Sequence, residues 1–228
     1  MPKSISSNHG CPFSQRLSFE TWVRPSRRCD AVQRALAWLE DPAQRWLGVA
    51  GPPVSGKTHF VHALGAHAST KWPELRVTLR TFEYLLNCPS SMMNEFMASE
   101  LVLIDDVHKR SASLSSDFTR AFDGSPRVVF TTLEEDCFPS QLRQKLEQQS
   151  GCWIHLQRPT LSARLGIARS KCELLGHFLS AEQLELIVRE AKNPRQIEGC
   201  VIRSARAHRC QTGRPSDGGA PHPGVDTR

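Results

Sequence analysis

The sequence of 228 residues predicts an α/β fold, a parallel sheet flanked by helices, followed by a small C-terminal all-helical unit. Two observations carry this prediction: short apolar runs alternate with amphipathic segments up to residue 156, and only helical patterns follow Pro159. Strands of a parallel sheet are buried on both faces and therefore read as continuous apolar runs. Five such runs occur, at Trp46–Ala50, Arg76–Leu79, Leu101–Ile104, Val128–Phe130 and Trp153–Leu156.

The segment after Pro159 contains three helical stretches, Leu161–Leu175, Ala181–Glu190 and Pro194–His208. Gly, Ser and Asn interrupt the helical pattern between them, as expected where helices end and begin. We therefore expect an α/β core over residues 18–158 and a helical lid over residues 159–210.

The two ends of the chain have a different composition from the rest. Residues 1–17 are polar and rich in Ser, Asn and Gly, and the tail from Thr212 holds four Gly and three Pro with almost no apolar side chain. Neither segment can bury enough apolar surface to offset its ordering entropy. We expect a flexible arm over residues 1–17 and a disordered tail over residues 211–228.

Composition excludes several classes of protein. With 39% hydrophobic and 23% charged residues the chain has ordinary globular proportions, and its net charge of +6 permits contact with nucleic acid without requiring it. The eight cysteines form no CxxC pair or zinc-ligand cluster, so we expect reduced thiols. We find no secretory signal and no apolar stretch of about 20 residues, which predicts a cytoplasmic protein without a membrane segment.

The strongest chemical signal follows the first apolar run and opens a helical pattern. It fits GxxxxGK[ST], a phosphate-binding loop in which glycines let the backbone amides face phosphate oxygens. Lys57 would reach the β- and γ-phosphates, and Thr58 would offer its hydroxyl to Mg²⁺. The alternative is a chance Gly/Pro turn, which the strand before it and the helix after it disfavour. The predicted nucleotide-binding residues are Gly51, Pro52, Pro53, Val54, Ser55, Gly56, Lys57 and Thr58.

Two carboxylates follow the apolar run Leu101–Ile104. At this Walker B position Asp105 would hold Mg²⁺, and Asp106 could orient or deprotonate the attacking water, so both are candidate catalytic residues. An apolar strand followed by Asp-Asp is common on its own, but together with a phosphate-binding loop it indicates a nucleotide site.

Three further residues that could contact the nucleotide lie outside these motifs. Thr131 and Thr132 end the fourth apolar run, where Thr132 could sense the γ-phosphate, or both could simply be β-branched residues that finish a strand. Arg195 lies in the first turn of a helix with Asn193 as its cap and Pro194 at its first position. A cation gains nothing from the dipole there, so we expect its guanidinium to face a nucleotide phosphate.

With these elements in this order, the sequence resembles the AAA+ ATPases of the DnaA type, and in size it is similar to the Hda regulators. Ser18–Val23 is similar to the family's N-terminal motif TFDNFV, GPPVSGKTHF to its Walker A segment and ELVLIDDVH to its Walker B segment. The segment NPRQIEG stands where the family carries its sensor 2 arginine. This last match is the most specific, because other P-loop proteins have no reason to share it.

The resemblance implies an AAA+ P-loop NTPase core with bound ATP or ADP and Mg²⁺, and slow hydrolysis if any. It also implies a cytoplasmic regulator of DNA replication initiation whose partners are the DnaA initiator and the sliding clamp, with homo-oligomers possible. Hda proteins carry a clamp-binding peptide, for which Gln15–Phe19 is a degraded candidate. Phe19 would otherwise simply begin the folded domain.

Three positions depart from the family pattern. Lys145 stands at the place of the arginine finger, with Arg143 nearby, and a lysine lacks the planar fork of an arginine. Residues 24–28 replace a glycine-rich loop, and Leu133 stands at the place of an acidic sensor 1 residue, which leaves Thr131 or Thr132 as substitutes.

Other functions remain open at the level of sequence. A helicase loader of the DnaC kind, or a phage or plasmid initiator reduced to its AAA+ module, would bind single-stranded DNA. A metabolic P-loop kinase is disfavoured by the family-like lid. Because no helix-turn-helix pattern follows Arg195, we expect no specific reading of duplex DNA.

Overall fold

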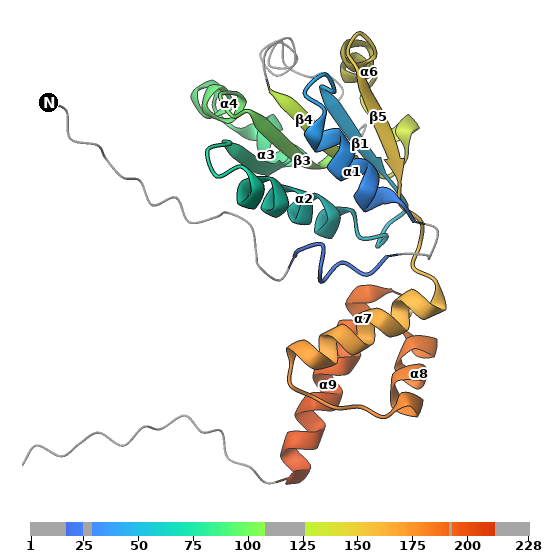
Figure 1. Ribbon diagram of the computed structural model, residues 1–228. Helices are drawn as coiled ribbons and strands as arrows, with labels where there is room; N and C mark the ends of the chain where they lie inside the picture. Colours follow the sequence, from blue (N-terminus) through green and yellow to red (C-terminus); the bar gives the residue numbers. More distant parts are fainter. Residues whose placement is uncertain (1–16, 25–28, 108–125, 192, 213–228) are drawn as a thin grey trace, which may run out of the picture. The chain divides into compact units, whose positions relative to one another are not determined.

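The computed structural model describes residues 17–24, 29–107, 126–191 and 193–212 (Figure 1). The chain divides into two compact units, residues 1–166 and 167–228. The division falls within α7 (Leu161–Leu174), a little beyond the predicted boundary at residue 158. The predicted arm and tail lie almost wholly outside the described residues.

A five-stranded parallel sheet forms the centre of the first unit. Its strands lie in the order β2-β3-β4-β1-β5, so β1 pairs with β4 and β5, both far away in the sequence. The parallel sheet predicted from the apolar runs is confirmed. The strands are β1 (Trp46–Ala50), β2 (Val77–Thr81), β3 (Leu101–Val107), β4 (Arg127–Thr132) and β5 (Gly151–His155).

The strand bounds differ from the predicted ones mainly at β3. We expected this strand to end at Ile104, but it continues through both aspartates to Val107. Val107 is buried and pairs with Thr132, which explains the extension. The two carboxylates thus lie near the carboxyl end of the strand, as predicted.

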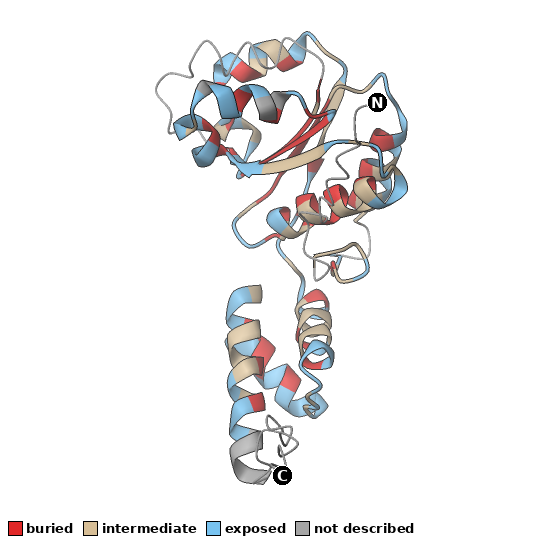
Figure 2. Cartoon of the chain, turned by 90° about the vertical axis from the view of Figure 1, so that its left-hand side faces the viewer, coloured by how far each residue is buried: buried red, intermediate tan, exposed pale blue. Residues whose placement is uncertain are grey.

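Helices cover both faces of the sheet (Figure 1). Alternate residues of β3 show the two faces: Leu101 and Leu103 belong to the cluster with α1 and α2, whereas Val102 and Ile104 belong to the cluster with α3, α4 and α6. Figure 2 shows the buried strands between helices whose outer sides are exposed. The helices are α1 (Ala31–Glu40), α2 (Lys57–Lys71), α3 (Phe82–Asn87), α4 (Ser90–Met97) and α6 (Ser140–Glu147), with a short 3-10 helix η1 (Glu135–Cys137).

An aromatic cluster packs on the face of the sheet that α3, α4 and α6 cover. The Phe130 ring stacks on Phe138 at 4.3 Å between centroids and meets the edge of Trp153 at 5.2 Å. The indole N–H of Trp46 donates to the carbonyl of Leu146 at 2.8 Å, so this buried donor is satisfied. These contacts attach β5 and α6 to the centre of the sheet.

Arg127, at the start of β4, binds the end of α1. Its guanidinium donates to the carbonyls of Leu39 at 2.8 Å, Gln44 at 3.0 Å and Asp41 at 3.1 Å, and also to that of Trp38. The Cζ atom of this guanidinium lies 4.1 Å from the centre of the Trp38 ring. One side chain thus donates to several carbonyls at and after the end of a helix, and it joins α1 to the start of β4.

The second unit is helical, as predicted. It comprises most of α7, then α8 (Ala181–Glu190) and α9 (Pro194–Thr212). Ser180 and Gln183 form a reciprocal capping box at the start of α8, and Gly176 adopts a φ of +59° in the turn before it. The helix α9 extends past residue 210, where we expected the tail to begin.

Two predictions from the composition, reduced cysteines and the lack of a membrane segment, can be compared with the structure. The cysteines at positions 29, 88, 137, 152, 172 and 200 are free thiols, as predicted. Among the described residues we find no helix with the length and apolar character needed to cross a membrane.

We predict that Arg127→Met lowers the free energy of unfolding by about 2–4 kcal/mol, because several carbonyls at and after the end of α1 lose a charged donor. Arg76→Ala serves as the control, since Arg76 is exposed and only 3.9 Å from Glu100, and it should cost less than about 0.5 kcal/mol. Denaturant unfolding of the two variants measures the difference. Equal losses would mean that the Arg127 contacts contribute nothing beyond a surface ion pair.

Candidate functional site

The loop Gly51–Thr58 turns tightly between the end of β1 and the start of α2. The amide of Gly51 is directed at the carbonyls of Thr132 and Leu133, at 3.2 and 3.1 Å. A Cβ at Gly51 would lie 2.6 Å from the carbonyl oxygen of Leu156, so only glycine fits there. Val54 and Gly56 have φ values of +60° and +95°, and Val54 is therefore a strained residue on the loop.

The ammonium of Lys57 lies inside this loop. Its Nζ donates to the carbonyls of Gly51 at 2.7 Å and Pro52 at 3.1 Å, and the residue is only 9% exposed. Burial lowers the pKa of Lys57, and the carboxylates of Asp106 and Asp105 act against that lowering. The loop thus holds a positive charge at the edge where β3 carries its two carboxylates.

The loop fits a polyphosphate. The Ser55 hydroxyl is buried and has no hydrogen-bond partner among the described residues, which is unusual for a native polar group. The helix α2 begins at Lys57 after Gly56, which has no side chain to cap the first amides. Unsatisfied amides, an orphaned hydroxyl and a buried ammonium in one loop are the donors that bind an anion at a helix N-terminus.

The predicted Walker B residues differ in their surroundings. Asp105 is 8% exposed, and the Thr131 hydroxyl donates to its Oδ1 at 2.5 Å. Asp106 is exposed and has a φ of +64°. Thr58, which would bind the same Mg²⁺ ion as Asp105, is exposed at the second position of α2. Their roles toward Mg²⁺ and water stay predictions.

Both threonines that end β4 are fully buried, and their hydroxyls have different partners. Thr132 lies beside Ala50 in the sheet and donates to the carbonyl of Glu134 at 3.1 Å. Thr131 is bonded to the Asp105 carboxylate. Contact of Thr132 with a γ-phosphate therefore stays a prediction.

The N-terminal motif packs against α2. The Trp22 ring meets the edge of Phe60 at 5.2 Å between centroids, and its indole nitrogen would lie 3.1 Å from a Cβ at Gly56. Phe19 packs on Phe60 as well, with 5.5 Å between centroids. Phe19 is thus part of the folded unit, and within the proposed clamp peptide Gln15 and Arg16 lie outside the described residues.

His59, which follows the Walker A threonine, holds this motif in place. Its Nε2 lies 3.1 Å from the carbonyl oxygen of Ser18 and 3.2 Å from the Thr21 hydroxyl. His62, one helical turn further, faces the buried side of α2, and burial lowers its pKa. Sequence reasoning did not assign these histidines a partner, because each contact joins residues some 40 positions apart or depends on burial.

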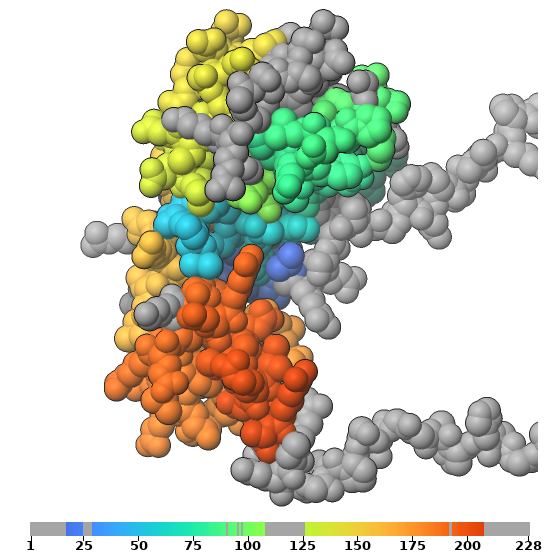
Figure 3. Space-filling model, turned by 180° about the vertical axis from the view of Figure 1, so that it is seen from behind, coloured from blue at the N-terminus to red at the C-terminus, as the bar shows by residue number. Residues whose placement is uncertain are grey.

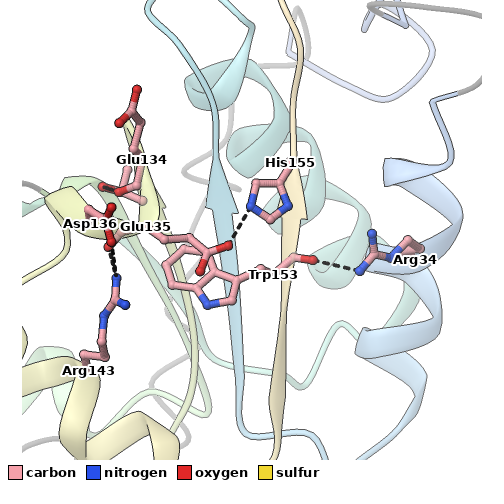
Figure 4. A network of polar contacts seen from close by, with 8 residues as sticks. Arg34, Glu134, Glu135, Asp136, Arg143, Trp153 and His155 are labelled. Atoms are coloured by element: carbon pink, nitrogen blue, oxygen red, sulfur yellow. Dashed lines mark hydrogen bonds and ion pairs between the residues drawn. The ribbon is translucent and has the colours of Figure 1, made fainter.

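A polar network joins η1 to α6 and β5 (Figure 4). The Arg143 guanidinium donates to the carbonyl of Glu135 and lies 3.9 Å from the Asp136 carboxylate, and His155 Nε2 lies 2.6 Å from a Glu135 carboxylate oxygen. Arg143, one of two candidates for the arginine finger, is thus engaged within its own chain. Lys145 is partly buried on the same helix, and its action on a neighbouring subunit stays a prediction.

Arg195 occupies the predicted place in α9. Asn193 caps the helix through its side-chain oxygen, which accepts the amide of Gln196 at 3.0 Å, and Pro194 is the first helical residue. Arg195 is exposed beside a cavity of about 540 Å³, and its role toward a phosphate stays a prediction. The cavity is lined by Glu190, Arg195, Gln196, Gly199, Cys200 and Arg203.

Similarity to known proteins indicates which family the chain resembles. No family model matches the chain. The chain is 25% identical over 225 residues to the chromosomal replication initiator DnaA of Deinococcus radiodurans, an alignment that covers 89% of this chain and 48% of that protein. Domain III of DnaA from Thermotoga maritima has a TM-score of 0.73, at 22% identity over 90% of this chain and 94% of that structure. The chain is thus similar in sequence to DnaA, and its fold resembles that of DnaA domain III.

The predicted AAA+ P-loop NTPase fold and the resemblance to the DnaA type are thereby confirmed. A second solved DnaA, bound to AMPPCP and single-stranded DNA, has a TM-score of 0.64 at 18% identity and covers 87% of this chain and 71% of that structure. The DnaA-like chain spans about half the length of the curated DnaA proteins that it matches. The similarity thus concerns their AAA+ region.

Proposed function

We propose that the chain binds an adenine nucleotide, ATP or ADP, together with Mg²⁺ in the loop Gly51–Thr58. The observation that carries the proposal is the buried Lys57 ammonium, which the loop holds with two of its own carbonyls. A phosphate oxygen is a better partner than a carbonyl for this cation, since the phosphate carries a negative charge and the carbonyl does not. The buried Ser55 hydroxyl and the uncapped amides of α2 would supply further donors.

The remaining residues of the site have distinct roles in this proposal. Asp105 and Thr58 would hold Mg²⁺, which neutralises phosphate charge and orients the phosphates. Exposed Asp106 could accept a proton from an attacking water at its carboxylate, while Thr132 would sense the γ-phosphate and Arg195 would bind phosphate from the helical lid. Hydrolysis would be slow, because Leu133 replaces the acidic sensor and Arg143 is engaged within its own chain.

We further propose that the chain regulates replication initiation in the manner of Hda proteins, acting on the DnaA initiator together with the sliding clamp. Its similarity to DnaA across 89% of its length supports a role beside an initiator. Bound nucleotide would act by favouring one conformation that a partner recognises. Homo-oligomers and a cytoplasmic location belong to the same proposal.

A second candidate function is binding of single-stranded DNA, as expected of a DnaC-like loader or a truncated initiator. The α3–α4 surface supports it: Tyr84 and Met92 are exposed there, and the Arg80 guanidinium lies 5.5 Å from the centre of the Tyr84 ring. This segment, green in Figure 3, forms part of the surface of the core unit. An exposed aromatic ring with an arginine beside it suits stacking of unpaired bases.

We predict that Lys57→Met weakens binding of a fluorescent adenine nucleotide in the presence of Mg²⁺ by at least about 100-fold, because the cation for the phosphates is lost. Lys71→Met is the matched control in the same helix, since Lys71 is exposed and pairs with Glu40 away from the loop. Equilibrium titration of both variants measures the effect. The proposal is wrong if the unmodified chain takes up no adenine nucleotide, or if both variants bind equally.

The regulatory role predicts capture of the sliding clamp by the nucleotide-bound chain, and faster hydrolysis of ATP bound to the DnaA initiator. If residues 15–19 make the clamp contact, Gln15→Ala should weaken capture by about 10-fold or more, whereas Gln148→Ala in an exposed position should not. Pull-down and phosphate release measure the two activities. Absence of both would exclude the Hda-like role.

The alternative role predicts that single-stranded DNA is retained more strongly as its length increases. Tyr84→Ala should then reduce affinity about 5- to 100-fold, the range expected when one stacked base loses its ring. Phe178→Ala is the control, because Phe178 is also an exposed aromatic residue, 95% exposed, but outside the α3–α4 surface. Equal affinities for the unmodified chain and the Tyr84 variant would exclude this surface as the binding site.

A further inference from the structure

The two Walker B aspartates lie in a β-bulge opposite a single threonine. Pairing between β3 and β4 runs regularly to Ile104 beside Phe130 and resumes at Val107 beside Thr132. Asp105 and Asp106 therefore face Thr131 alone, which is the two-against-one arrangement of a bulge. Such a bulge bends the strand and redirects the side chains that follow.

The backbone of the bulge is strained. Asp106 has a φ of +64°, in the left-handed region that costs most residues about 1–2 kcal/mol. Aspartate tolerates this conformation better than a β-branched residue, but the conformation persists only where neighbouring groups hold it. The direction of the exposed Asp106 carboxylate thus depends on what fixes its backbone.

The Thr131 hydroxyl makes two contacts with the bulge. It donates to Oδ1 of Asp105 at 2.5 Å and accepts the backbone N–H of Asp106 at 2.8 Å. Thr131 is fully buried, so water does not reach this hydroxyl in competition. Its single proton is committed to a carboxylate, which leaves none to donate to a phosphate.

We propose that Thr131 is the positioning residue of the site: its hydroxyl sets the orientation of Asp105 toward Mg²⁺ and keeps Asp106 in its bulged conformation. This proposal rests on the proposed nucleotide function and adds to it a residue that acts through others. It also replaces the interpretation of Thr131 as a phosphate sensor. Residues that orient a metal-binding carboxylate typically contribute 10- to 100-fold to metal affinity or activity.

The adjacent residue provides a matched comparison. Thr132 is the same residue type and equally buried, but its hydroxyl donates to the carbonyl of Glu134 in the loop after β4. Replacing either threonine by valine removes one hydroxyl and changes side-chain volume little. Only the change at Thr131 removes the contacts to Asp105 and Asp106.

The experiment measures binding of a fluorescent ATP analogue during titration with Mg²⁺, and again in excess chelator. Thr131→Val should raise the Mg²⁺ concentration for half-maximal enhancement of binding about 10- to 100-fold, with affinity in chelator changed less than about 3-fold. Thr131→Ser, which keeps the hydroxyl, should retain the magnesium response of the unmodified chain. A purely structural defect would instead weaken binding in both conditions.

Two results would overturn the proposal: an unchanged magnesium response in Thr131→Val, or an equal loss in Thr131→Ser. If Thr131→Val does not fold, Thr131→Cys replaces it, since a thiol is a weak donor and acceptor of similar size, and the same criteria apply. An unmodified chain that binds no nucleotide would overturn the proposed function as well. Binding by the unmodified chain with no effect at Thr131 would overturn this proposal alone.

Discussion

The site depends on one electrostatic arrangement, a buried ammonium close to two carboxylates at the carboxyl edge of a parallel sheet. Lys57 is held by the loop carbonyls of Gly51 and Pro52, and Asp105 and Asp106 favour its charged form against the cost of burial. A buried cation of this kind persists only where hydrogen bonds and nearby anions compensate the lost solvation. The loop, the helix after it and the end of β3 must therefore keep their relative positions.

The sheet supplies that rigidity. Because β1 lies between β4 and β5, the phosphate-binding loop at its end is joined to neighbours on both sides. The Gly51 amide contacts carbonyls at the end of β4, and Trp22 lies close to Gly56. The aromatic cluster around Phe130 fixes β5 and α6 against the same strands.

Local features that oppose stability gather at this edge. Val54 and Asp106 have positive φ values, and the Ser55 hydroxyl is buried with no partner among the described residues. Each costs free energy that regular packing elsewhere must offset, and such features are concentrated at functional sites. All three residues belong to the predicted motifs, so these features lie at the site that the motifs predict.

Much of this protein follows from its sequence alone. Continuous apolar runs predicted the parallel strands, the spacing of Gly51, Gly56 and Lys57 predicted the loop, and Asn193-Pro194 predicted the start of α9, because these are local constraints on backbone and burial.

Only the tertiary structure decided which distant groups meet. It joined Arg127 to the end of α1, His59 to Ser18, and the Thr131 hydroxyl to Asp105 and Asp106. The sequence predicted Thr132 as the candidate phosphate sensor and assigned Thr131 no separate role, since nothing in a run of β-branched residues tells which hydroxyl faces a neighbouring strand. Strand order and a one-residue bulge between β3 and β4 make that choice, and both arise from pairing between residues far apart in the chain.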